Sequence, residues 1–223
     1  MRIPVLLMLP VLCGLLVSVP AAAEPSQSGF VLARLKYGGG GDWYQGSTKN
    51  LLRALRERTS VPVSRNDEAQ VELSDPDLYK YPFLYMNGHG TVRFSELEAA
   101  RLREYLLAGG FLFANDDYGM DQSFRRELRK VFPEHELVEL PFDHPIYHCF
   151  YDLPRGIPKI HEHDAKPAQG LAILHNGRVV LFYAFESDIG DGFEDPTVHG
   201  DPAPIREEAL KMGVNIVLYA MTH

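Results

Sequence analysis

The sequence is poor in thiols, in tryptophan and in positive charge. Its 223 residues include two cysteines and one tryptophan, and 22 lysines and arginines stand against 30 aspartates and glutamates, for a formal net charge of −8. Two cysteines are too few for a disulfide framework, and the acidic balance excludes nucleic acid as an expected partner, because a phosphate backbone would be repelled. With 45% hydrophobic and 23% charged residues, the composition is that of a globular protein.

Long unbroken apolar runs are also missing. Residues 3–19 form an apolar run that is interrupted by Pro4 and Pro10 and is shorter than the roughly 20 residues of a spanning helix. Because this run follows Arg2 and precedes three alanines, residues 1–23 are predicted to be a secretory signal peptide. An uncleaved anchor is the alternative, which the prolines disfavour. We expect an exported, periplasmic protein with no integral membrane span after cleavage and one domain over residues 24–223.

Apolar spacing along that domain predicts alternating strands and helices. The predicted strands are residues 30–37, 83–86, 111–114, 171–174 and 178–185. The predicted helices are residues 47–58, with Ser47 as N-cap, a helix opened by the Ser95 and Glu98 capping box, residues 121–132, and a last helix after Pro202. Residues 135–169 form a long, proline-rich excursion that holds at most a strand at 136–140.

This order predicts a three-layer α/β domain. Strands that alternate with helices give a mostly parallel open sheet with helices on both faces. The Asn176-Gly177 pair predicts a tight hairpin, which adds antiparallel strands at one side.

Polar residues follow the predicted strands. In an open parallel sheet a ligand binds beyond the carboxyl ends of the strands, so we expect these residues to converge on one acidic edge. The candidates for ligand binding are Asp42, Trp43, Tyr44, Asn87, Asn115 and Asp188, and the candidates for catalysis are Asp116, Asp117 and His89. The alternative is that Asn, Asp and Gly are simply turn formers there.

The Asp116-Asp117 doublet is the strongest of these signals. Two adjacent carboxylates at the end of a buried strand repel each other unless a cation or a donor compensates them. A divalent metal ion or acid-base work is therefore the chemistry that we expect beside His89.

Glycines 38–41 precede a predicted helix but do not predict a phosphate site. Ser47 stands where a phosphate-binding loop needs lysine, and Asp42 would repel the anion. We interpret the glycines as a backbone turn, with Trp43 and Tyr44 lining a pocket for a polar, sugar-like ligand.

His144 and His148 have the spacing of a helical metal pair. Pro145 makes a helix there doubtful, so aromatic packing or loop hydrogen bonds remain the alternative to metal binding. His161 and His163 are expected to be solvated. Cys149, the sole thiol left after signal cleavage, is expected to be buried and structural, and the sequence has no G-x-S-x-G motif for a serine nucleophile.

The motifs YGGGGDWY (residues 37–44), YMNGHG (85–90), LLAGGFLFANDD (106–117) and DHPIYHCFY (143–151) resemble a bacterial family of domains of unknown function. That family is grouped by fold with class I glutamine amidotransferases and trehalose-utilisation-type domains, so the resemblance implies a glutamine-amidotransferase-like or flavodoxin-like sheet. Glutaminases of that fold carry a nucleophilic cysteine after a central strand. Here that stretch holds Asn115, Asp116 and Asp117, so a thiolate reaction is not expected.

Two hypotheses follow. The first is an exported domain that binds a small polar ligand at the acidic edge, with metal-assisted hydrolysis by Asp116, Asp117 and His89. The second is a non-catalytic module of the cell envelope whose edge is only rich in turns. Sequence alone identifies neither the ligand nor a cofactor.

Overall fold

The computed structural model describes residues 29–223, so the predicted signal peptide lies outside the described residues. The described strands are β1 Phe30–Lys36, β2 Val63–Glu72, β3 Phe83–His89, β4 Phe111–Tyr118, β5 Val138–Glu139, β6 Gln169–His175 and β7 Arg178–Phe185. The described α-helices are α1 Lys49–Arg58, α2 Glu96–Leu107, α3 Asp121–Val131, α4 Pro196–His199 and α5 Ala203–Thr222. Short 3₁₀ turns are η1 Leu78–Lys80, η2 Pro145–Tyr147 and η3 Asp191–Phe193.

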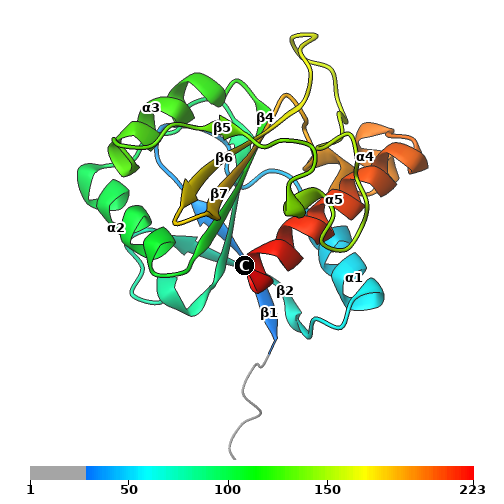
Figure 1. Ribbon diagram of the computed structural model, residues 1–223, viewed down its shortest axis with the longest axis horizontal. Helices are drawn as coiled ribbons and strands as arrows, with labels where there is room; N and C mark the ends of the chain where they lie inside the picture. Colours follow the sequence, from blue (N-terminus) through cyan, green and yellow to red (C-terminus); the bar gives the residue numbers. More distant parts are fainter. Residues whose placement is uncertain (1–28) are drawn as a thin grey trace, which may run out of the picture.

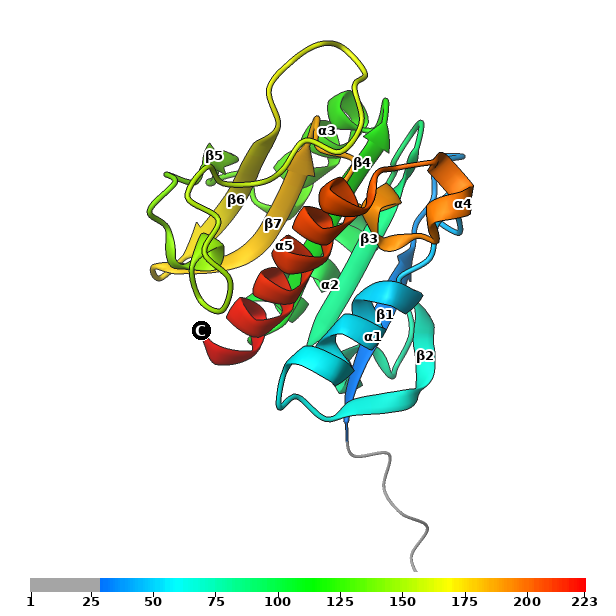
Figure 2. The same cartoon turned by 90° about the vertical axis from the view of Figure 1, so that its right-hand side faces the viewer.

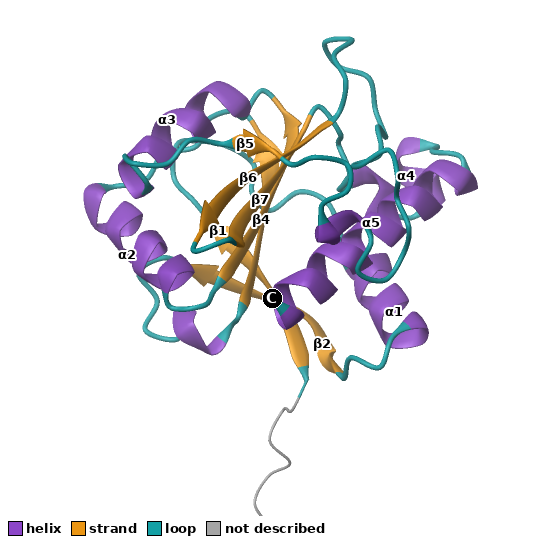
Figure 3. Ribbon diagram, viewed as in Figure 1, coloured by secondary structure: helices purple, strands orange, loops and turns teal. Residues whose placement is uncertain are grey.

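The strands form one seven-stranded sheet in the order β2-β1-β3-β4-β7-β6-β5. Strands β2, β1, β3, β4 and β7 are parallel, and β6 and β5 continue the sheet antiparallel. The five parallel strands thus follow the 2-1-3-4-5 order of doubly wound sheets of the flavodoxin type. The three-layer α/β prediction is confirmed, with α2 and α3 on one face and α1 and α5 on the other (Figures 1 and 3).

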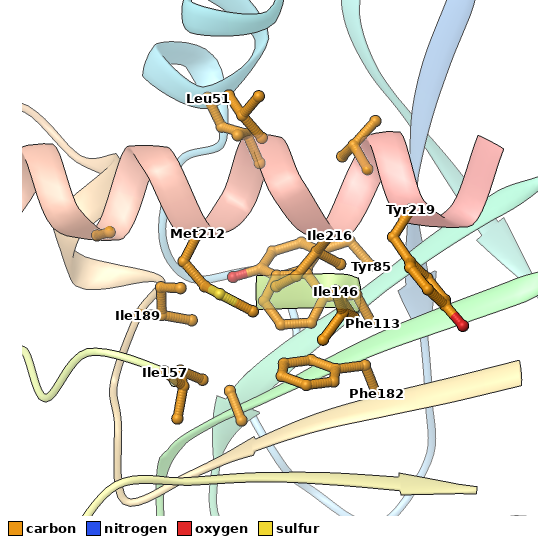
Figure 4. Packing of buried hydrophobic residues seen from close by; sticks show 14 of the residues in the cluster. Leu51, Tyr85, Phe113, Ile146, Ile157, Phe182, Ile189, Met212, Ile216 and Tyr219 are labelled. Carbon is orange, nitrogen blue, oxygen red and sulfur yellow. The ribbon is translucent and has the colours of Figure 1, made fainter. Parts of the chain in front are cut away.

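Strand alternation gives each face its own apolar layer. Tyr85, Phe113 and Phe182 face α5, where they lie among Met212 and Ile216 (Figure 4). Their neighbours one residue away in sequence face α2 and α3, as Leu84, Leu112 and Leu181 do. Burial of each such side chain contributes about 1.5–3 kcal/mol, so both faces of the sheet are fixed by their cores.

Hydrogen bonds at the first residues of α2 and α1 explain why one predicted helix start agrees with the structure and the other does not. The capping box is confirmed, since Ser95 Oγ accepts from the Glu98 backbone N–H and Glu98 accepts from the Ser95 N–H. Helix α1 instead starts two residues later than predicted, at Lys49, without a side-chain cap. The Thr48 hydroxyl donates to Glu68 of β2 at 2.7 Å and is not used as a cap.

The apolar periodicity of the sequence did not predict β2, and it predicted β3 and β4 to be shorter than they are. β2 is an edge strand of mostly polar sequence, VSRNDEAQVE, so it has no apolar run to reveal it. β3 and β4 extend beyond the predicted ends at residues 86 and 114, to His89 and Tyr118. The polar residues there belong to strands, so their side chains alternate between the two faces of the sheet.

The excursion between α3 and β6 covers the α5 face and then reaches the carboxyl ends of the strands. Its strand is only the two-residue β5, and Ile146, Leu153 and Ile157 join the core beside α5. The chain then arches above the strand tips before it enters β6, as the yellow segment in Figure 2 shows. The hairpin prediction is confirmed, with Asn176 and Gly177 both at positive φ between β6 and β7.

Within residues 29–223, no helix combines the length and the apolar character that crossing a membrane requires.

Candidate functional site

A polar cavity of about 320 Å³ lies at the carboxyl ends of the parallel strands. We call it the Asp117 cavity. Its lining residues are Asp42, Gln45, Gly46, Tyr85, Asn87, His89, Asp117, Gly190, Asp191 and His199. Asp42 follows β1 and Asn87 lies in β3, so the cavity is at the point where the strand order reverses, which is the ligand-binding position of such sheets.

A larger groove of about 490 Å³ runs beside the start of α5. Its lining, residues 152–160 with Pro204, Ile205 and Glu208, is rich in proline and aliphatic side chains. Because convergent polar groups mark a functional site better than volume does, we assign the candidate site to the Asp117 cavity.

Two asparagine amides fix the Asp117 carboxylate. Asn87 Nδ2 donates to Asp117 Oδ2 at 2.9 Å, and Asn115 Nδ2 donates to Oδ1. Burial raises the pKa of Asp117 to about 7, against the lowering effect of the Asn87 hydrogen bond. A carboxyl group whose pKa lies near neutrality can take and return a proton under physiological conditions.

Arg34 of β1 fixes the orientation of Asn87, which in turn donates to the Asp117 carboxylate. Its buried guanidinium pairs with Glu68, donates to the Gln45 carbonyl at 2.8 Å, and donates to Asn87 Oδ1. Asn87 Nδ2 therefore has to face Asp117, because its Oδ1 is occupied by the arginine. A buried cation of β1 thus sets the position of the carboxylate two strands away.

His89 and Asp42 form a pair at the mouth of the cavity. His89 Nδ1 lies 3.1 Å from Asp42 Oδ2, and Asp42 Oδ1 accepts the His89 backbone N–H. A carboxylate can only accept, so this contact fixes the tautomer that carries a proton on Nδ1 and leaves Nε2 for other partners.

The turn after β7 is strained and buried. Glu186 and Asp188 both have positive φ, at 55° and 53°, which is uncommon for residues with a side chain. Ser187 between them accepts the Ile160 N–H at its carbonyl and donates through Oγ to the Pro158 carbonyl. Strain that the surrounding contacts maintain is a feature of functional sites, and here it ties the excursion to the strand end.

Asp188 is the most perturbed carboxyl group of this turn. Its side chain is 3% exposed, and burial raises its pKa to about 10, with Asp191 and Asp117 adding to the effect. Asp188 Oδ2 lies 2.8 Å from His163 Nε2, whereas Oδ1 is buried without a hydrogen-bond partner. A buried carboxylate oxygen without a donor is costly, which agrees with the raised pKa of this group.

Three further ligand-type residues meet at the wall of the Asp117 cavity. The side chains of His161, Asp191 and His199 place one ligand atom each within 4.8 Å of one another. Asp191 Oδ2 lies 2.8 Å from His161 Nδ1 and 3.3 Å from His199 Nδ1. We call these three residues the His161 cluster. Sequence analysis named neither Asp191 nor His199 as a site candidate. It expected His161 and His163 to be solvated, whereas their side chains are only 32% and 18% exposed and are paired with carboxylates.

The structure separates the predicted catalytic doublet. Asp117 faces the cavity, whereas Asp116 points to the opposite face of the sheet, as alternation within β4 requires. Asp116 accepts from the Met120 N–H at 3.0 Å and from the Tyr183 hydroxyl at 3.1 Å, ahead of α3. Burial raises the pKa of Asp116 as well. Its donors come from the turn into α3 and from β7, and Asp116 lines a separate cavity of about 320 Å³ on that side of the sheet.

The predicted ligand-binding residues lie at different depths. Asp42 and Asn87 line the cavity, and Asn115 and Asp188 lie buried behind its wall. Trp43 and Tyr44 are not among its lining residues. Trp43 lies under the Lys36 ammonium group, with 5.4 Å between Nζ and the ring centroid, and Tyr44 is 60% exposed.

His144 and His148 do not reach the cavity. His144 Nδ1 accepts the Ile146 N–H, and its ring packs on Tyr219 near the end of α5. His148 lies between the Asp152 carboxylate and the Phe142 carbonyl. Tyr219 is ten residues beyond Ala209, which packs against Gly192 of η3, so the two positions are about 15 Å apart along the helix. The loop hydrogen bonds and aromatic packing that were the alternative to metal binding are what the structure contains.

Cys149 is exposed, so the expectation of a buried thiol is wrong. Its Sγ donates to the Asn215 carbonyl at 3.3 Å, and partial burial of the sulfur raises the pKa of the thiol. A raised thiol pKa is the opposite of what an activated nucleophile needs.

Comparison with known proteins identifies a family but no activity. A search of curated proteins found no match. The model of a domain of unknown function, DUF4159, matches residues 31–221, which covers nearly all of the described chain and every residue of the cavity. The chain therefore belongs to the DUF4159 family.

Proposed function

We propose that the protein is an exported, periplasmic hydrolase that binds a small polar ligand in the Asp117 cavity and cleaves it with acid-base chemistry and the assistance of a divalent metal ion. The observation that carries the proposal is the cavity carboxylate itself: Asp117 is buried, fixed by two amide donors, and has a pKa of about 7. The polar lining favours a hydrophilic ligand, with a carbohydrate-like molecule as one candidate.

The roles follow from the donors and acceptors. Ionised Asp117 takes a proton from a water molecule whose oxygen attacks the electrophilic centre of the ligand. The bond to the leaving oxygen breaks, and that oxygen takes a proton from His89 Nε2. Asp42 stabilises the positive charge on His89 before the transfer and holds the ring by its Nδ1–H. Asp117 then loses its proton to solvent and His89 regains one, so the site returns to its starting state.

The strand order supports a relation to the glutamine-amidotransferase-like fold and to trehalose-utilisation-type domains. Both place chemistry beyond the carboxyl ends of parallel strands, as the Asp117 cavity does. In this chain the end of β4 supplies Asn115 and Asp117 instead of a thiol, so the proposed reaction uses water as the nucleophile.

A panel of p-nitrophenyl esters, phosphate esters and glycosides tests this proposal. We expect the purified protein to hydrolyse at least one class, Asp117→Ala to lose at least about 100-fold in kcat/KM, and His89→Ala to lose about tenfold or more. Asp116→Ala is the matched control, because it removes the neighbouring carboxylate and leaves the cavity intact. Circular dichroism verifies that each variant folds.

Turnover that Asp117→Ala leaves unchanged would overturn the proposal. Absence of turnover on all three classes, with no change in melting temperature on addition of the corresponding products, would favour a non-catalytic envelope module.

A further inference from the structure

The His161 cluster joins three segments that are distant in sequence. His161 comes from the excursion that arches over the strand tips, Asp191 begins η3, and His199 ends α4. Figure 2 shows the excursion and α4 at the same end of the sheet. The rings of His161 and His199 lie 5.5 Å apart, with Asp191 Oδ2 in contact with both.

The ligand atoms of the cluster all lie within 4.8 Å of one another, and the two separations from Asp191 are close to those of one metal coordination sphere. Ligands about 2.0–2.1 Å from a tetrahedral ion are roughly 3.3 Å from each other. The measured separations from Asp191 Oδ2 are 2.8 Å to His161 Nδ1 and 3.3 Å to His199 Nδ1. Two imidazoles and one carboxylate, with a fourth position open to water, form the ligand type of catalytic zinc sites.

His161 has the outer contact that orients a metal-bound histidine. Its Nε2 lies 3.0 Å from Asp201 Oδ1, and Asp201 is itself nearly buried. Because both ring nitrogens face carboxylates, the ring needs either two protons or one proton and a cation at Nδ1. A carboxylate behind the distal nitrogen is the usual support of a histidine ligand.

Two buried carboxylate oxygens around the cluster have no hydrogen-bond partner. Asp188 is 2% exposed, its Oδ2 lies 3.8 Å from His161 Nδ1, and its Oδ1 has no hydrogen-bond partner. Asp201 Oδ2 is buried without a partner too. Among the side chains that the structure describes, those of residues 29–64 and 68–223, no lysine or arginine forms an ion pair with Asp117, Asp188, Asp191 or Asp201. A divalent cation would supply the missing charge.

We propose that His161, Asp191 and His199 bind one first-row divalent metal ion, with Zn²⁺ as the best fit, at the wall of the Asp117 cavity. Two nitrogen ligands favour such an ion over Mg²⁺ or Ca²⁺, which prefer oxygen. Asp191 and His199 also line the cavity, so the ion would contact a ligand held beside Asp117. The role of the ion in hydrolysis rests on the proposed function, whereas its binding stands on these ligands alone.

Calorimetric titration of the chelator-treated, untagged protein with Zn²⁺ tests the site. We expect one ion per chain with a Kd on the order of 10 μM or lower. The double variant His161→Ala/His199→Ala should lose at least about 100-fold in affinity. The matched control, His144→Ala/His148→Ala, removes two histidines from the same part of the chain and should stay within about twofold of wild type. A roughly hundredfold excess of Mg²⁺ should not displace Zn²⁺.

Two further measurements keep the test decisive if the double variant does not fold. Asp201→Asn changes only the residue behind His161 and should weaken Zn²⁺ binding by about 10-fold or more. Co²⁺ bound to the wild type should show the visible bands of a tetrahedral site. The proposal is overturned if wild type does not bind Zn²⁺, or if the His144 and His148 variant loses the ion while the His161 and His199 variant keeps it. Asp117-dependent turnover that persists in chelator would overturn the role of the ion in the proposed hydrolysis, whereas the titration alone decides whether the ion binds.

Discussion

Two consecutive aspartates end on opposite sides of the sheet and have opposite surroundings. Asp116 lies on the α3 side, where the Met120 N–H and the Tyr183 hydroxyl donate to it. Asp117 lies on the α5 side, where two asparagine amides hold it at the wall of a cavity that also contains Asp191 and His199. Both carboxyl groups are equally buried, at 5% exposure, so burial does not distinguish them.

The two carboxylates differ in which groups surround them. The donors of Asp116 belong to the turn into α3 and to β7, and they are part of the fold. Asp117 instead lies close to further carboxylates, and Arg34 is linked to it only through Asn87, so no described lysine or arginine side chain pairs with it directly. A side chain whose interactions are complete serves the structure, and one that faces unbalanced charge in a cavity is available to a ligand.

The largest loss of stability is expected from Arg34→Leu, which removes the cation beneath the cavity. Glu68 would lose its charged partner and keep only the Thr48 hydroxyl, and the Gln45 carbonyl and Asn87 Oδ1 would lose the arginine as a donor. Breaking a buried pair in this way costs about 3–5 kcal/mol. Denaturant unfolding measures it, and Arg93→Leu, at an exposed arginine, is the control and should change stability by less than about 0.5 kcal/mol. Equal losses in the two variants would show that Arg34 does not support the cavity.

The next effect separates the two aspartates directly. Asp116→Ala leaves the Met120 N–H without an acceptor and the Tyr183 hydroxyl with only Asp121, at 3.2 Å, and should cost about 1–3 kcal/mol of stability. Asp117→Ala takes an acceptor from the Asn87 and Asn115 amides, but it also removes a carboxylate that is costly to bury. These two effects offset each other, so its stability near pH 7 should stay within about 1 kcal/mol of wild type. Chemical denaturation of both variants tests this contrast. The comparison fails if Asp117→Ala is the more destabilised of the two.

Sequence patterns predicted the fold because the relevant chemistry is local. The Ser95 capping box and the Asn176-Gly177 turn each act within a few residues, and the apolar strands carry their own periodicity. Strand β2 was not predicted, because an edge strand buries little apolar surface and its sequence therefore carries no apolar pattern.

The candidate site was predictable only in outline. The ends of the predicted strands indicated where the acidic edge lies. Because β4 was predicted to end at residue 114, Asp116 and Asp117 were not recognised as strand residues whose side chains alternate between the two faces of the sheet. His161 and His199 lie in segments without periodicity, and contacts such as that of Ile160 N–H with the Ser187 carbonyl bring His161 to the edge. The His144 and His148 spacing suggested a metal pair only if the segment were a helix, and η2 is a single short turn.

A smaller effect is expected on the pH dependence of stability. The folded-state pKa of Asp117 is about 7, above its usual value of 3.8, because of burial, with Asp191 and Asp116 raising it and Asn87 and His89 opposing. Between pH 3.8 and about 7, the Asp117 carboxyl group is therefore protonated in the folded state and ionised in the unfolded state. The free energy of unfolding falls by about 1.4 kcal/mol per pH unit as pH rises through that window.

Thermal melts of chelator-treated protein between about pH 5 and pH 7 measure this contribution. The melting temperature of wild type relative to Asp117→Ala should fall by roughly 3–5 °C per pH unit as pH rises. The same series on Asp116→Ala shows how much of the slope the neighbouring carboxylate contributes. A difference between wild type and Asp117→Ala that does not vary with pH would mean that Asp117 is not buried as described.

The smallest effect is expected at Cys149. Its thiol is exposed and lies in the excursion, where it donates one weak hydrogen bond to the Asn215 carbonyl. Cys149→Ser keeps a donor of similar shape, so stability should change by less than about 0.5 kcal/mol and any hydrolysis found for wild type should remain. Iodoacetamide should modify the wild-type thiol slowly, because partial burial raises its pKa. Loss of activity in Cys149→Ser would instead make a thiolate the nucleophile and move the chemistry away from Asp117, since the two residues belong to separate parts of the fold.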